Sequence, residues 1–379
     1  MVNYSPPENN NYQNFQNNQN WTFRPKQPHF VPRSIWNREK RQIKKLSFIA
    51  ASAVIAFILL SSVFTGVAQG ILSVVSVMGT ASDYQQFAAK WNSAQFQYVF
   101  EIIYSVFVIG GAFFTAGYFA KKKGYLGTIP MGKPKNAKLM PLIIVGGFGV
   151  CLFGNIITSY FDAIIQAVFG FNMNIPQMPE TPRSVTGIML FYLSTAVVPA
   201  LIEEMALRGI VMQFLRRYGD LFAIICSALI FGLMHCNLMQ IPFAIIAGVA
   251  IGYAVVVTES VWTGVIIHFL NNAFSVTVSI VDDFYGLQST EYIICNAVFY
   301  FVIAIGGLCT FMYFKKYNKP LKKTKLVNQG KNFYGIPHPM SARVSNGSLY
   351  KAFLLTFPMI IAFIAVLYET IIITQIYAQ

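Results

Sequence analysis

Charged residues are scarce in this sequence of 379 residues, and acidic residues are the scarcest of them. Asp, Glu, Lys and Arg together make up only 11% of the chain, whereas hydrophobic residues make up 55%. Such a composition excludes an ordinary soluble domain and indicates a protein that crosses a membrane several times.

The imbalance of charge gives a formal net charge of +14, from 28 Lys and Arg against 14 Asp and Glu. The basic residues lie in short segments between apolar runs, as the positive-inside rule describes for membrane proteins. We therefore expect membrane lipid as a partner and no nucleic acid.

Cysteine and histidine are also few. All five cysteines lie in apolar segments and none forms a Cys-x-x-Cys pair, which argues against disulfides and thiolate metal sites; they are Cys151, Cys226, Cys236, Cys295 and Cys309. The chain has no His-Glu-x-x-His zinc motif. Of the four histidines, only His235 and His268 lie in apolar runs, so these two are candidates for a site inside the membrane.

The apolar runs predict an all-α, polytopic membrane bundle of about eight to nine transmembrane helices, because a helix needs roughly 20 apolar residues to cross a bilayer. The expected spans are 46–68, 97–120, 139–161, 184–217, 221–236, 240–257, 261–281, 291–314 and 352–373. Two glycines four residues apart in the sixth span, Gly248 and Gly252, predict a close approach of another helix.

Four regions follow from these runs. Residues 1–45 form an Asn/Gln-rich tail that cannot bury a core, so we expect disorder there. The remaining regions are N-terminal transmembrane helices at 46–169, a core at 184–281, and C-terminal helices at 291–379 with a basic segment at 315–351. The distribution of Lys and Arg predicts a multi-pass plasma-membrane protein with a cytoplasmic N-terminus.

The fourth span contains adjacent carboxylates, Glu203 and Glu204, followed by Arg208. Ionisable residues are costly at such depth and usually mark function. Glu204 and Arg208 are four residues apart, so they can pair on one helix face. Glu203 is turned about 100° away and is left for another partner.

Two further pairs lie on later spans. Phe231 and His235 share one helix face, and counting from the turn at 218–220 puts Glu203 and His235 at a similar depth, roughly 20 Å, so we expect them to meet. His268 and Asn272 also share a face, about 14 Å deep by the same count. Asn271 is expected to point elsewhere.

Together these residues suit the hydrolysis of an amide bond without a covalent nucleophile. A carboxylate and an imidazole can activate a water molecule, and two side-chain donors can stabilise an oxyanion. Alternatively, Glu203, His235 and His268 could hold zinc, because glutamate and histidine are acceptable zinc ligands.

At this point the sequence resembles the type II CAAX prenyl endopeptidases, also called the CPBP or Abi family of intramembrane proteases. Its three motifs stand here in order as Glu203-Glu204-Met-Ala-Leu-Arg208, Phe231-Gly-Leu-Met-His235 and His268-Phe-Leu-Asn-Asn272. The resemblance covers about 185–280. It implies an intramembrane endopeptidase that acts on a membrane-associated protein or peptide.

The resemblance also implies a role for each residue. Glu203 and His235 would activate the water, His268 and Asn272 would form the oxyanion hole, and Glu204 and Arg208 would support the site together with Phe231. Databases commonly describe the family as metallo-endopeptidases; we favour a metal-free site, with zinc on Glu203, His235 and His268 as the alternative.

Other functions stay open from the sequence. Bacterial relatives are linked to bacteriocin immunity, so a non-catalytic immunity or scaffold protein that keeps the fold is one alternative. A transporter that relays protons through the glutamates and histidines is another, although no internal repeat supports it.

Overall fold

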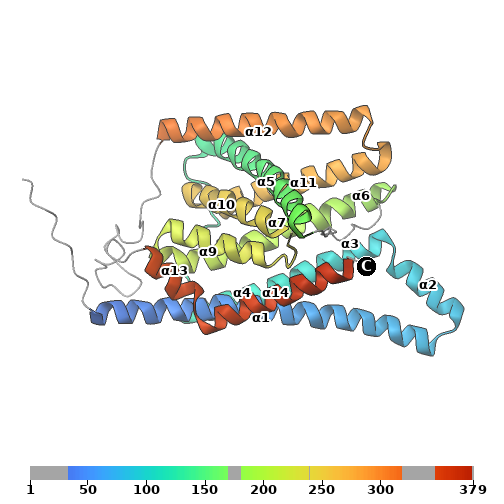
Figure 1. Ribbon diagram of the computed structural model, residues 1–379, viewed down its shortest axis with the longest axis horizontal. Coiled ribbons are helices and arrows are strands. Elements are labelled where there is room, and N and C mark those ends of the chain that lie inside the picture. Colours follow the sequence, from blue (N-terminus) through green and yellow to red (C-terminus); the bar gives the residue numbers. More distant parts are fainter. Residues whose placement is uncertain (1–32, 170–180, 239, 318–345, 378–379) are drawn as a thin grey trace, which may run out of the picture. The chain divides into compact units, whose positions relative to one another are not determined.

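The computed structural model describes residues 33–169, 181–238, 240–317 and 346–377 (Figure 1). Within these ranges every regular element is a helix, which confirms the all-α prediction. The longer helices are α1 (Arg33–Met78), α5 (Met140–Phe169), α10 (Gln240–Thr258), α11 (Val261–Tyr285), α12 (Thr290–Tyr317) and α14 (Phe357–Tyr377).

Seven helical segments in the described residues are long and apolar enough to cross a membrane. The pair formed by α13 (Asn346–Leu354) and α14, bent by 69°, makes eight if it counts as one span. The expected fifth span, 221–236, is shorter than predicted: it is α9 (Asp220–Leu233), with 14 residues. The chain turns directly after α9, where Cys236 takes a left-handed conformation with φ 47°.

The N-terminal region is more helical than the sequence indicated. The described chain begins with α1 at Arg33, so residues 33–45 of the predicted disordered tail are helical, while residues 1–32 lie outside the described part. A second helix, α2 (Ala81–Trp91), forms between the expected spans 46–68 and 97–120, where the sequence predicted only a connecting loop. Thr80 and Asp83 form a reciprocal capping box at its start, which satisfies backbone N–H groups of the first turn.

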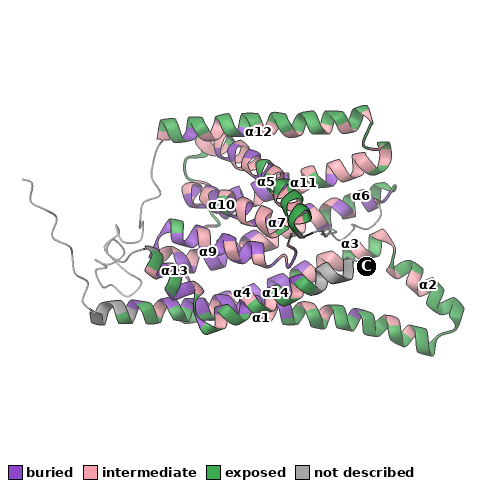
Figure 2. Ribbon diagram, viewed as in Figure 1, coloured by how far each residue is buried: buried purple, intermediate pink, exposed green. Residues whose placement is uncertain are grey.

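The centre of the bundle is formed by α9, α10 and α5 together with a long broken helix, Val185–Tyr218. In Figure 2, α9 and α10 carry many buried residues, whereas α12 is largely exposed. A Cβ at Gly248 would lie 2.9 Å from Ala228 Cβ on α9. The predicted close approach at this small residue is therefore confirmed.

The helices α9 and α10 form an antiparallel hairpin whose two outer ends lie on one side of the bundle. Gly248 faces Ala228, and Gly252 faces Ile224, one turn nearer the start of α9. The turn after α10 is tied to the loop before α5: Lys135 N donates to Thr258 O at 2.7 Å. The loop at 121–138 and the turn at 258–260 thus lie together.

The last described helices cover α1. The Ser47 hydroxyl of α1 donates to Phe353 O and lies 2.6 Å from the Thr356 hydroxyl, at the bend between α13 and α14. These buried polar contacts hold the bent pair against α1, since a polar group in an apolar environment needs a hydrogen-bond partner.

Candidate active site

Glu203 and Glu204 lie in the broken helix Val185–Tyr218, which consists of several short segments. Ser184 caps its start by accepting from Gly187 N. The chain then passes through α6 (Val185–Tyr192), the π-helical η3 (Leu193–Val197), α7 (Val198–Glu204), the π-helical η4 (Met205–Val211), α8 (Met212–Leu215) and η5 (Arg216–Tyr218). π-helical turns occur frequently at functional sites, and here one directly follows the two glutamates.

Arg208 and Glu204 form the buried polar centre of the site. Both side chains are fully buried, and Arg208 Nη1 donates to Glu204 Oε1 at 2.7 Å, as the spacing of four predicted. Arg208 Nη2 donates to Gly248 O on α10 at 3.3 Å, and the guanidinium lies 4.5 Å from the Phe231 ring centroid. Arg208 therefore links three segments of the bundle around Glu204.

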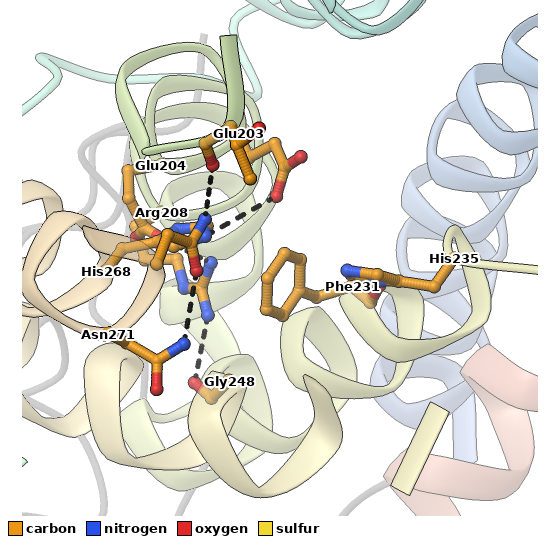
Figure 3. Close-up of polar contacts among 10 residues, drawn as sticks. Glu203, Glu204, Arg208, Phe231, His235, Gly248, His268 and Asn271 are labelled. Carbon is orange, nitrogen blue, oxygen red and sulfur yellow. Dashed lines mark hydrogen bonds and ion pairs between the residues drawn. The ribbon is translucent and has the colours of Figure 1, made fainter. Parts of the chain in front are cut away.

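His268, on α11, joins the two glutamates. Its Nδ1 lies 2.9 Å from Glu204 Oε1, and its Nε2 lies 3.9 Å from Glu203 Oε2 (Figure 3). An ionised carboxylate can only accept, and Glu204 is paired with Arg208, so Nδ1 carries the proton that Glu204 binds. This bond fixes the ring so that Nε2 faces Glu203.

His235 is on the other side of Phe231 from His268 (Figure 3). The Phe231 centroid is 5.0 Å from the His235 ring and 5.7 Å from the His268 ring, edge-on in both cases. His235 Nδ1 lies 2.9 Å from Phe231 O. Glu203 and His235 line the same cavity, while the histidine that forms an ion pair with Glu203 among the described residues is His268.

Asn272 is positioned by a backbone oxygen that a proline leaves free. Pro199 has no N–H for the carbonyl of Thr195, four residues earlier in the helix. Thr195 O accepts from Asn272 Nδ2 at 3.1 Å, and Asn271 Nδ2 donates to Asn272 Oδ1 at 3.1 Å. Both ends of the Asn272 amide are thus oriented, and one N–H of the amide remains for another acceptor.

The predicted catalytic residues line one cavity of about 80 Å³. Glu203, His235, His268 and Asn272 all line it, as does Phe231. The volume admits water, since a water molecule occupies about 30 Å³ in the liquid. The four candidates from three separate spans therefore share one enclosed space.

The sequence missed several residues of this cavity. Asn271 lines it, although it was expected to point elsewhere. Cys151 of α5 and Phe243 of α10 line it as well, and no motif marks either residue. Gly264 lies one turn before His268, and a Cβ there would stand 2.9 Å from Glu204 Oε2; only its spacing of four from His268 could have drawn attention to it.

The zinc alternative requires Glu203, His235 and His268 to converge on one point. His268 Nδ1 is hydrogen-bonded to Glu204, and the Phe231 ring lies between the His235 and His268 rings. Among the described residues, no group of three His, Cys, Asp or Glu side chains is placed to hold a metal ion. The donor set does not fit a zinc site in this arrangement.

The fold and the site define a helical membrane protein with a buried centre of carboxylates, imidazoles and an amide. Residues 185–274, which contain all of these groups, match the family model described as type II CAAX prenyl endopeptidase Rce1-like. This match supports the family resemblance that the three motifs indicated.

A curated relative points in the same direction. The chain is 23% identical over 167 residues to the "Putative membrane peptidase YdiL" of Bacillus subtilis (strain 168), an alignment that covers 43% of this chain and 67% of the relative. No solved structure shows significant similarity. The family and this relative support a membrane-protease-like function.

Proposed function

We propose that this protein is an intramembrane endopeptidase that hydrolyses a peptide bond of a membrane-associated protein or peptide with a water molecule activated by Glu203. The proposal rests on the different surroundings of the two adjacent glutamates. Glu204 is fully buried and bound by Arg208 and His268, whereas the Glu203 side chain is 14% exposed and lines the cavity.

Glu203 acts as the general base. Its carboxylate removes a proton from water as the water oxygen attacks the carbonyl carbon of the substrate. The 3.9 Å between Glu203 Oε2 and His268 Nε2 is too long for a direct hydrogen bond but allows one water to contact both atoms.

His268 and Asn272 stabilise the tetrahedral intermediate. As an imidazolium, His268 donates from Nδ1 to Glu204 and from Nε2 to the oxyanion. Asn272 donates the N–H that Thr195 O leaves free. Preorganised donors of this kind each contribute about 10²–10³-fold to the rate.

His235 lines the same cavity and takes part in the proton transfers of the reaction. It shares the water with Glu203 across the substrate, and one of these two groups returns the proton to the leaving nitrogen as the C–N bond breaks. The products are a carboxylate and an amine. No step passes through a metal ion.

The test is cleavage of a quenched fluorescent peptide library by the full chain in lipid nanodiscs. Glu203→Gln should lower kcat by about 10²–10⁴-fold, the usual contribution of a general base. Glu291→Gln, at an exposed glutamate in the first turn of α12, serves as the matched control and should cleave as the native chain does. Equal cleavage by Glu203→Gln and the native chain contradicts the proposal.

The second candidate is a non-catalytic immunity or scaffold protein, which the weak identity to the curated relative keeps open. It predicts that no peptide is cleaved by the native chain, and that Glu203→Gln keeps any protective phenotype in cells. A phenotype lost in Glu203→Gln and kept in Glu291→Gln favours the endopeptidase.

A further inference from the structure

A second cavity, of about 200 Å³, contains a carboxylate that the proposed reaction does not use. Glu101 of α3 (Ala94–Tyr104) lies in it, half-buried, within the helical segment Ala94–Lys122 that is apolar enough to cross a membrane. The other lining residues are aromatic, hydroxyl-bearing or proline: Tyr98, Tyr104, Ser105, Phe191, Ser194, Thr195 and Pro199. A carboxylate in such surroundings is costly and calls for a function.

The surroundings of Glu101 suit a cation. No Lys, Arg or His of the described residues forms an ion pair with it; the ion pairs there involve other acidic residues. Tyr98 is stacked on Phe191, with ring centroids 4.9 Å apart, and both rings line the cavity. Aromatic faces and a carboxylate both attract an ammonium or guanidinium group.

This cavity adjoins the proposed active site through one residue. Thr195 lines the second cavity, while its carbonyl oxygen accepts the hydrogen bond of Asn272, which lines the first. Pro199, four residues before Glu203, also lines the second cavity. A peptide bound with its scissile bond at Glu203 can therefore place a neighbouring side chain beside Glu101.

We propose that Glu101 and the aromatic residues around it form a subsite for a Lys or Arg side chain of the peptide substrate, next to the scissile bond. This inference rests on the proposed function, since it names a feature of the peptide that the same site binds. The volume suits one side chain, because pockets for whole small-molecule ligands are larger, about 300–1,000 Å³. Glu101 itself lies outside residues 185–274, so the acidic residue of the subsite is not part of the matched segment.

Binding tests the subsite separately from catalysis. The probe is a fluorescein-labelled peptide of 12 Leu and Ala residues that carries a single Lys, moved along the peptide, with norleucine in place of Lys as the uncharged partner. Affinity for the full chain in phosphatidylcholine nanodiscs is measured by fluorescence anisotropy, and binding to empty nanodiscs is subtracted. At one position we expect Lys to bind roughly 10- to 100-fold more tightly than norleucine, as for a hydrogen bond to a charged group.

Three variants separate the outcomes. Glu101→Gln should reduce the Lys-to-norleucine ratio to about one, Glu101→Lys should favour a peptide with Glu at that position, and Glu291→Gln should keep the native ratio. Equal affinity for Lys and norleucine peptides at every position, or a Lys preference that survives in Glu101→Gln, overturns the subsite. A Glu101-dependent preference without any cleavage supports the subsite and contradicts the proposed reaction; cleavage without the preference does the reverse.

Discussion

Glu203 and Glu204 are neighbours in sequence with opposite surroundings. Glu204 Oε1 accepts hydrogen bonds from both Arg208 and His268, and its side chain is inaccessible. Glu203 has no such bonds among the described residues and faces the cavity with His268 3.9 Å away. A buried charge that loses its partner is strongly destabilising, so we propose a structural role for Glu204 and the chemical role for Glu203.

Gly264 packs close to the side chain of Glu204. A Cβ there would stand 2.8 Å from Val255 Cγ2 and 2.9 Å from Glu204 Oε2, closer than real Cβ contacts. We expect Gly264→Ala to lower the free energy of unfolding by about 1–3 kcal/mol, the usual cost of overpacking. It should also lower peptide cleavage at least tenfold, because a displaced Glu204 carries His268 with it. Thermal unfolding and kcat/KM in nanodiscs measure the two effects.

Gly307→Ala is the matched control for this prediction. Gly307 is also helical, on α12, but a Cβ there would meet nothing within 4 Å. Its stability and kcat/KM should match those of the native chain. If Gly264→Ala behaves like Gly307→Ala, the close fit of α11 against Glu204 is wrong.

At this scale, the sequence predicted pairs along one helix and which residues gather at the site, but not each contact between helices. The Glu204–Arg208 pair followed from a separation of four residues. Glu203 and His235, at similar counted depths, line the same cavity. The ion pair between Glu203 and His268 was not predicted, because counting residues gives depth in the membrane but not lateral position. Asn271 reaches the cavity although it is turned about 100° from Asn272, because the cavity spans both positions.

Pro199 shapes the broken helix at the level of the element. It follows the π-helical η3, lies in the first turn of α7, and leaves Thr195 O available for Asn272. A proline in a helix interior costs about 3 kcal/mol relative to alanine. Here the proline also orients Asn272, a proposed oxyanion donor. Replacing Pro199 should therefore keep or raise the stability of the protein but lower its activity.

Pro199→Ala tests this arrangement. The new N–H can bond Thr195 O within the helix and compete with Asn272, so we expect kcat to fall by roughly 10- to 100-fold, less than or comparable to the loss of one oxyanion donor. The midpoint of thermal unfolding should stay equal or rise. Pro358→Ala, in the first turn of α14 where no such carbonyl is available, should leave kcat unchanged. Full activity in Pro199→Ala would show that Asn272 does not depend on the proline.

The sequence predicted most helices but not how they begin, break or end. The apolar runs located the long spans, and Ser184 marked the start of the broken helix. Hydropathy could not show that α9 ends after 14 residues, or that η3 and η4 are π-helical. It also placed a loop where α2 forms, because α2 is polar and is fixed by its capping box rather than by burial.

The whole molecule has one side defined by a cluster of loops. Val261 N donates to Pro130 O, and Ser260 Oγ donates to Gly132 O, so the turn after α10 lies against the basic loop before α5. The positive-inside rule predicts that this side is cytoplasmic. The turn after α11, with Gly286 at φ 85°, follows a full span and belongs to the opposite side.

Cysteine labelling tests this orientation. In a background without the five native cysteines, Leu287→Cys should react with a membrane-impermeant maleimide on intact cells. Lys133→Cys should react only after the cells are permeabilised. Both positions are exposed, so reactivity reports sidedness rather than burial. The reverse pattern would invert the topology and the predicted cytoplasmic N-terminus.

The most direct test of the proposed hydrolysis measures peptide cleavage and metal content on one purified sample. Peptide cleavage by the native chain and by Glu203→Gln is measured beside elemental analysis by mass spectrometry. We expect the native chain to cleave without stoichiometric metal and to remain active after chelation, and Glu203→Gln to lose activity. Activity that rises and falls with bound zinc, or that survives in Glu203→Gln, would contradict a metal-free reaction in which Glu203 activates the water.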